Sequence, residues 1–151
     1  MEYITKNAKE TQKIAAKIIN DLIKVRGRKA GVLILALEGE LGAGKTTFVQ
    51  GFAKGLKIKE KILSPTFVIL KRFKIYDLRF KNFKNLYHID CYRINIADEI
   101  LALDFGRIIS EPSNIVVIEW AEKIKEILPP ETIWLKFEHL GEDERRIQIL
   151  N

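Results

Sequence analysis

The sequence predicts an α/β protein in three layers, with a mixed sheet whose parallel core is extended by antiparallel strands. Helical and strand-like patterns alternate along the chain, and this alternation favours a sheet covered by helices on both faces. An apolar strand pattern comes early, and a glycine-rich loop follows it directly. The length of 151 residues suits one hydrophobic core. We therefore expect a single domain over residues 1–151.

The first predicted element is an amphipathic helix over residues 7–25. From Ile14 onward, apolar residues recur every three or four positions, which is the spacing of one helix face. Asn7 and Glu10 have the spacing of a capping box at the start of the helix. Gly27 follows and is expected to end it.

The apolar run at residues 32–37 predicts a buried strand, and residues 39–46 behind it read Gly-Glu-Leu-Gly-Ala-Gly-Lys-Thr. This is the P-loop pattern, in which glycines let backbone N–H groups surround a phosphate at a helix N-terminus. Lys45 is placed to reach the β and γ phosphates. Thr46 can offer its hydroxyl to Mg²⁺, which prefers hard oxygen ligands. The sequence therefore predicts a nucleotide-binding loop and a P-loop NTPase-like fold.

The remaining patterns continue the alternation of helices and strands. Helices are predicted at residues 47–54, 98–105 and 121–128. Strands are predicted at residues 66–76, 85–92 and 115–119, with a final antiparallel pair at residues 133–137 and 146–150. Ligands of such sheets bind beyond the carboxyl ends of the strands, so we expect the functional residues there.

The composition favours a cytoplasmic protein without a membrane partner. Apolar residues make up 47% of the chain and charged residues 30%, as in globular proteins. No apolar run approaches the length of a membrane span, and the first residues lack the apolar core of a signal peptide. The single cysteine, Cys91, excludes an internal disulfide and a cysteine-based zinc site, and its place in a strand predicts a core residue.

Positive charge gathers in residues 54–84, which hold ten Lys and Arg against two acidic residues. This basic segment has a net charge of +8, whereas the rest of the chain has −2. Five aromatic residues interleave with these charges: Phe67, Phe73, Tyr76, Phe80 and Phe83. Such a segment fits an RNA-facing surface that attracts phosphates. It also fits a solvated hairpin whose aromatic side chains pack inward, and both interpretations stay open.

Two carboxylates stand where apolar strand patterns end. Asp90 closes one strand, and Glu119 closes a run of four apolar β-formers. Hydrolysis at a P-loop needs a carboxylate that holds the metal and a group that orients the attacking oxygen. Glu119 is the more similar to the Walker B position, although Asp is the usual residue there. The alternative for either residue is a cap on the following helix.

Other residues are weaker candidates. Thr66 follows a proline-stiffened turn and could act like a switch-loop threonine. Trp120 is either a core anchor or an aromatic lid beside the nucleotide. Arg93 and Arg107 could reach phosphates as internal arginine fingers, but we expect them to be solvated or paired with carboxylates. His88 shares a strand face with Asp90 by alternation, but we assign it no role.

Four motifs, in this order, resemble the TsaE family, formerly YjeE. They are Leu-Gly-Ala-Gly-Lys-Thr-Thr-Phe at 41–48, Ser-Pro-Thr-Phe at 64–67, His-Ile-Asp-Cys-Tyr-Arg at 88–93 and Ile-Glu-Trp-Ala-Glu-Lys at 118–123. The resemblance implies a small ATPase that uses ATP and Mg²⁺ and is required for threonylcarbamoyl modification of the adenosine next to the tRNA anticodon. It further implies weak hydrolysis alone and stimulation by a TsaB–TsaD complex. Contact with tRNA would run through that complex or through the basic segment.

The same resemblance implies roles for single residues. Thr46 and Glu119 would hold Mg²⁺. Asp90, Lys45 and Thr66 would be catalytic. The nucleotide would be bound by Leu41, Gly42, Ala43, Gly44, Lys45, Thr46 and Thr47, with Thr11 near the base or ribose and Trp120 beside the nucleotide. One departure is that residues 68–85 are longer and more basic than is usual for the family.

Two other functions fit parts of the sequence. A small-molecule or polynucleotide kinase also uses a P-loop, but it usually adds an Arg-rich lid. No Arg cluster comes directly after the strand that ends at Glu119, where the basic residues are Lys123 and Lys125. A non-catalytic RNA-binding module would use the basic segment and bind tRNA in a salt-sensitive way. No Asn-Lys-x-Asp segment is present, which argues against a GTPase.

Overall fold

The computed structural model describes residues 1–26, 31–63 and 69–150. Within them, one sheet has the strand order β1-β7-β6-β2-β5-β4-β3. The strands are β1 (Glu2–Thr5), β2 (Leu33–Gly39), β3 (Leu70–Lys74), β4 (Asn85–Asp90), β5 (Asn114–Glu119), β6 (Ile133–His139) and β7 (Arg145–Ile149). The helices are α1 (Ala8–Arg26), α2 (Lys45–Gly55), α3 (Ala97–Leu101) and α4 (Phe105–Ile108), with 3-10 segments η1 (Leu78–Phe80) and η2 (Ala121–Ile127).

The sheet is mixed, as the sequence predicts. Its central strands β6, β2, β5 and β4 run parallel to one another. β7 pairs antiparallel with both β6 and β1, and β3 pairs antiparallel with β4 at the other edge. The parallel core brings the carboxyl ends of β2, β4 and β5 to the same edge of the sheet, and this is where the functional residues are expected.

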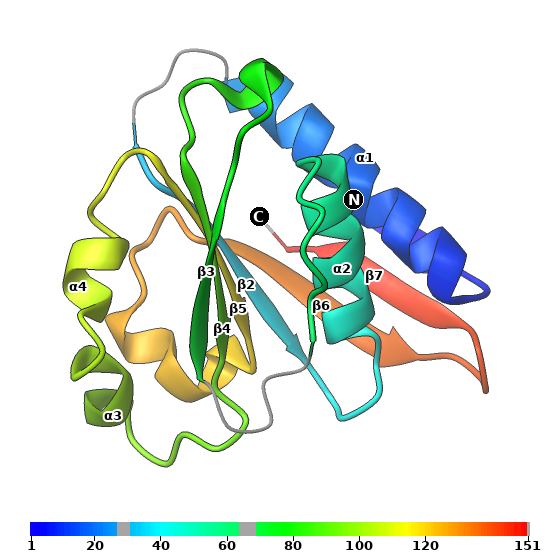
Figure 1. Ribbon diagram of the computed structural model, residues 1–151. Coiled ribbons are helices and arrows are strands. Elements are labelled where there is room, and N and C mark those ends of the chain that lie inside the picture. The colour runs from blue at the N-terminus through cyan, green and yellow to red at the C-terminus, as the bar shows by residue number, and fades with distance from the viewer. Residues whose placement is uncertain (27–30, 64–68, 151) are drawn as a thin grey trace.

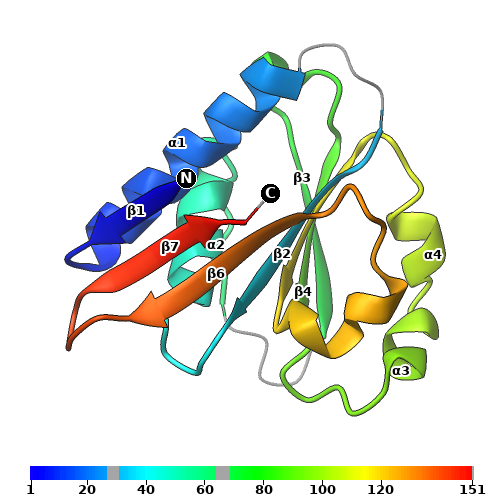
Figure 2. The same ribbon diagram turned by 180° about the vertical axis from the view of Figure 1, so that it is seen from behind.

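The sheet separates two hydrophobic cores, because successive side chains of a strand point to opposite faces. Along β2, Leu33, Leu35 and Leu37 belong to the core under α1 and α2, whereas Ile34 and Ala36 belong to the core under α3, α4 and η2. Figure 1 shows α1 and α2 on one side of the sheet and α3 and α4 on the other. Figure 2 shows the orange η2 segment on the α3–α4 side. This arrangement confirms the three-layer α/β fold.

Several element boundaries differ from the predictions. The single helix expected at residues 98–105 is two helices, α3 and α4, because Asp104 between them is left-handed with φ 65° and cannot continue a helix. The helix expected at residues 121–128 is the 3-10 segment η2, which is kinked at Ile124. Strand β1 has no counterpart among the predictions. Among the described helices, none has the length and apolar character that crossing a membrane requires.

The crossing of α1 and α2 depends on Gly51. A Cβ atom there would lie 2.3 Å from the backbone Cα of Gln12. We expect Gly51→Ala to lower the free energy of unfolding by about 1–3 kcal/mol, because overpacking forces the two helices apart. Thermal unfolding followed by circular dichroism measures this change. Gly106→Ala in α4 is the control, since nothing lies within 4 Å of its Cβ position. Equal melting temperatures for the two variants would contradict the close crossing.

Candidate functional site

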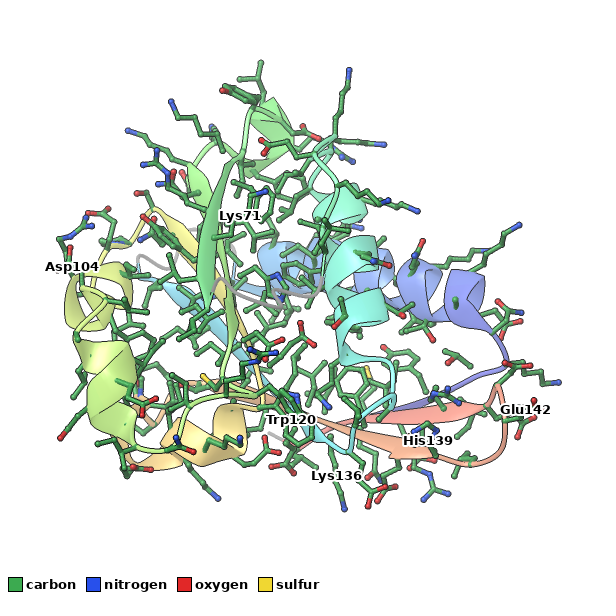
Figure 3. The ribbon with its side chains drawn as sticks, turned by 60° about the horizontal axis from the view of Figure 1, so that its bottom comes forward. Lys71, Asp104, Trp120, Lys136, His139 and Glu142 are labelled. Atoms are coloured by element: carbon green, nitrogen blue, oxygen red, sulfur yellow. The ribbon has the colours of Figure 1, made fainter. Side chains whose placement is uncertain are left out.

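A pocket of about 310 Å³ lies at the carboxyl ends of β2, β4 and β5. It is lined by Leu41, Gly42, Gly44, Lys45, Thr46, Thr47, Asp90, Tyr92, Arg93, Glu119 and Trp120. Figure 3 shows Trp120 between η2 and the loop that follows β2. Most of the residues singled out in the sequence therefore meet in one place, although they come from three separate strand ends.

The loop between β2 and α2 depends on its glycines. Gly42 and Gly44 have φ angles of 75° and 98°, in the left-handed region that glycine adopts without steric cost. The turn ends at Gly44, and α2 begins at Lys45. The first amides of a helix have no partner within it, so this N-terminus is suited to an anion. The side chain of Ala43 is buried, and the backbone N–H of Ala43 donates to the backbone carbonyl of Glu40.

Lys45 is the buried cation of the pocket, with 4% of its surface exposed. Its Nζ donates to the backbone carbonyl of Glu40 at 2.8 Å and to that of Gly39, and it lies 4.1 Å from the ring centroid of Trp120. Burial lowers the pKa of Lys45, and the negative charge of Glu119 is the largest influence in the opposite direction. The ammonium of Lys45 is thus held by neutral carbonyl groups. A phosphate group could take their place and, because it is charged, would bind the ammonium more strongly.

Glu119 joins two strands and the glycine-rich loop. Its Oε1 accepts a hydrogen bond from Oγ1 of Thr46 at 2.7 Å, and its Oε2 lies 2.6 Å from Nε2 of His88. Glu119 and His88 are each 2% exposed. No role for His88 was predicted from the sequence. Alternation places it on the face of Asp90, but only the pairing of β4 beside β5 reveals Glu119 as its partner.

Asp90 lies directly opposite Glu119 in the parallel pairing of β4 and β5. Its Oδ1 accepts a hydrogen bond from the N–H of Tyr92 at 2.9 Å, and its side chain lines the pocket. Burial raises the pKa of Asp90, and the neighbouring charge of Glu119 acts in the same direction. A carboxylate with a raised pKa in a pocket is a candidate proton acceptor.

Trp120 follows Glu119 with a left-handed φ of 57°. Such a conformation costs a residue other than glycine about 1–3 kcal/mol and is typical of functional sites. The conformation turns the indole over Lys45, and the ring also lies 5.2 Å from that of Tyr92. Trp120 lines the pocket and packs against the core on the α3–α4 side, so its position is compatible with both roles considered for it.

Among the described candidates, Thr11 does not line the pocket. Thr66 lies outside the described residues. The side chain of Thr11 is 2% exposed, and its hydroxyl is 2.8 Å from that of Thr5. This geometry does not support a nucleotide contact by Thr11. Arg107 is exposed and paired with Asp104, as expected, whereas Arg93 lines the pocket.

The oxygen atoms at the pocket suit Mg²⁺. The hydroxyl of Thr46 and the carboxylates of Glu119 and Asp90 are hard donors. Across the described residues, no group of three or more His, Cys, Asp or Glu side chains is arranged to hold a metal ion. Mg²⁺ at this place would therefore need phosphate oxygens and water to complete its shell, and this is its usual coordination with nucleotides.

The described residues of the basic segment, 54–63 and 69–84, do not line the pocket. The Lys and Arg side chains of the segment are exposed, but Phe73 and Phe80 are buried and Tyr76 is 81% exposed. Phe67 lies outside the described residues. Lys71 stands on the edge strand β3, and in Figure 3 it lies well away from Trp120. The inward packing of Phe73 and Phe80 matches the solvated-hairpin interpretation. Lysines on an edge strand also prevent edge-to-edge pairing with another sheet.

Comparisons with known proteins agree with these motifs. A family model described as threonylcarbamoyl adenosine biosynthesis protein TsaE matches residues 5–147. A tRNA threonylcarbamoyladenosine biosynthesis protein TsaE from Bacillus subtilis is 42% identical over 114 residues, which are 76% of this chain and 66% of that protein. The protein of the same description from Aquifex aeolicus is 34% identical over 150 residues, which are 98% of this chain and 94% of the relative.

A solved structure shares the fold. The crystal structure of Bacillus subtilis YdiB superposes with a TM-score of 0.68 at 33% sequence identity, and the match covers 99% of this chain and 83% of YdiB. The family match spans almost the whole chain, and relatives along most of its length are more than 30% identical. The chain therefore belongs to the TsaE family of tRNA threonylcarbamoyladenosine biosynthesis proteins.

Proposed function

We propose that this protein is a Mg²⁺-dependent ATPase that acts in threonylcarbamoyl modification of the adenosine next to the tRNA anticodon. The observation that carries the proposal is the convergence of Lys45, Thr46, Glu119 and Asp90 on one pocket beside a helix N-terminus. A cation, a hydroxyl and two carboxylates in this arrangement are the groups that phosphoryl transfer requires. The family to which the chain belongs supplies the pathway.

Each residue would have a distinct task in hydrolysis. The ammonium of Lys45 would leave the carbonyls of Gly39 and Glu40 and bind the β and γ phosphates, while the first amides of α2 bind the same phosphates. Thr46 and Glu119 would hold Mg²⁺, which when bound neutralises the phosphate charge. Asp90 would orient the attacking water and accept its proton.

We further propose that a TsaB–TsaD complex is the partner of this site. The pocket faces outward beside the exposed Tyr92, so a partner surface can reach it. The tRNA would be met through that complex or through the basic segment, whose exposed Lys and Arg side chains attract phosphates. A role in tRNA modification also implies a cytoplasmic location.

The proposal predicts slow ATP hydrolysis by the isolated protein and strong acceleration by the partner complex. Groups supplied in trans can raise such rates by about 10³–10⁵-fold. Phosphate release measured with and without an active TsaB–TsaD complex checks this expectation. No acceleration by an active complex would contradict the partnership. Transfer of the phosphate to a nucleoside, a sugar or an RNA end, in place of release, would instead identify a kinase.

A further inference from the structure

We propose that His88 is a positioning residue that fixes which oxygen atom of Glu119 meets the metal ion. The inference rests on the proposed function and deepens it. Among the described residues, His88 does not line the pocket, and it reaches the site through its 2.6 Å contact with Oε2 of Glu119. It therefore acts through the carboxylate and does not touch the nucleotide.

The two oxygen atoms of Glu119 have different surroundings. An ionised carboxylate can only accept hydrogen bonds, so the Nε2–H of His88 donates to Oε2. Oε1 accepts from the hydroxyl of Thr46 and lies on the side of the glycine-rich loop. With Oε2 held inside the sheet, Oε1 is the atom presented to a metal ion. The structure thus favours one-oxygen coordination by Glu119.

Glutamate has a longer and more flexible side chain than aspartate, so the carboxylate of Glu119 needs a partner such as His88 to hold its orientation. Aspartate is the usual Walker B residue of P-loop NTPases. The extra methylene of Glu119 adds a rotatable bond that lets the carboxylate swing away from Thr46. A hydrogen bond from a side chain that is itself 2% exposed removes that freedom. Partners of this kind orient metal-binding carboxylates, and their loss typically costs about 10–100-fold in metal affinity or activity.

Two substitutions of similar polarity test the proposal. In His88→Gln, the side-chain amide reaches about as far as Nε2 and still donates to Glu119. In His88→Asn, the amide ends one bond earlier and falls short of Oε2. Tyr87→Phe is the matched control, because Tyr87 is the preceding residue on the other face of β4 and belongs to the opposite core.

The readout is ATP affinity measured by calorimetry in EDTA and over a series of Mg²⁺ concentrations. We expect His88→Asn to raise the Mg²⁺ concentration for half-maximal effect by about 10–100-fold while its affinity for ATP in EDTA stays at the wild-type value. His88→Gln and Tyr87→Phe are expected to stay within a few-fold of wild type. A merely structural histidine would change both affinities together, or neither.

The outcomes separate this inference from the proposed function. Wild-type protein that gains no ATP affinity from Mg²⁺ would refute the proposed function and this inference with it. If ATP affinity depends on Mg²⁺ in the wild-type protein and depends on it equally in His88→Asn, only the role of His88 would be overturned. Loss of the folded state in both His88 variants, seen by circular dichroism, would assign His88 to folding and likewise overturn the inference.

Discussion

Replacing Lys45 with methionine is expected to reduce ATP turnover by about 10²–10³-fold or more, as the loss of one transition-state donor typically does. The same change is expected to leave the melting temperature of the ligand-free protein unchanged or higher. Burial lowers the pKa of Lys45, so the folded state binds this proton less tightly than the unfolded chain does. At neutral pH the charge therefore costs folding stability. Methionine keeps the apolar stem beside Trp120 without that charge.

Phosphate release and thermal unfolding on the same preparation measure both effects of Lys45→Met. Lys54→Met is the control, because Lys54 lies in the last turn of the same helix and bonds Gln12 outside the pocket. We expect wild-type turnover from the control. If Lys45→Met retains ATP turnover, the assignment of this pocket as the site of ATP hydrolysis would be refuted. Lost turnover together with a collapsed melting curve would show that Lys45 supports the fold, in contradiction to the stability argument.

Local patterns in the sequence predict the central part of the fold. The apolar run of β2, the glycine-rich loop and α2 are consecutive in the chain, so one stretch of sequence contains the whole unit. The apolar residues at 115–118 likewise predict β5, because a strand buried on both faces needs apolar residues at successive positions. Residues at the ends of such strands can therefore be named as candidates from the sequence alone.

Strand β1 illustrates what local patterns miss. It has only four residues, and two of them, Glu2 and Thr5, are polar. It exists because β7 offers an antiparallel partner from the other end of the chain, with Glu2 opposite Gln148. Thr5 is nevertheless fully buried, with its hydroxyl bonded to Thr11. Tertiary pairing overrides the weak local propensity.

His88 illustrates the same limit at the site. Its contact with Glu119 joins residues 31 positions apart. The distance follows from the strand order, in which β4 lies beside β5. Alternation alone shows which face His88 occupies and cannot show which strand is adjacent. The glycine-rich loop was predictable because its function requires neighbouring residues, whereas the carboxylate and its partner meet only in the folded sheet.

Neutralising each of the two carboxylates of the pocket, Glu119 and Asp90, is expected to impair a different property of the protein. Glu119→Gln removes the charge next to Thr46. Loss of a partner that only supports a metal ligand typically costs about 10–100-fold in metal affinity, so we expect Mg²⁺-dependent ATP binding to weaken by at least this factor. Asp90→Asn keeps the shape of the side chain but removes its proton acceptor. We expect ATP binding within a few-fold of wild type and turnover lower by about 10²–10⁴-fold.

Calorimetry of Mg·ATP binding and single-turnover phosphate release measure the two effects separately. Glu126→Gln is the control, because Glu126 is an exposed carboxylate on η2 that does not line the pocket. Equal losses of binding in Glu119→Gln and Asp90→Asn would refute the division of roles, since both carboxylates would then act on the metal ion. Binding that survives in both variants while turnover disappears would instead assign both to the attacking water. Only a binding defect confined to Glu119→Gln supports a metal role for Oε1 and a proton-accepting role for Asp90.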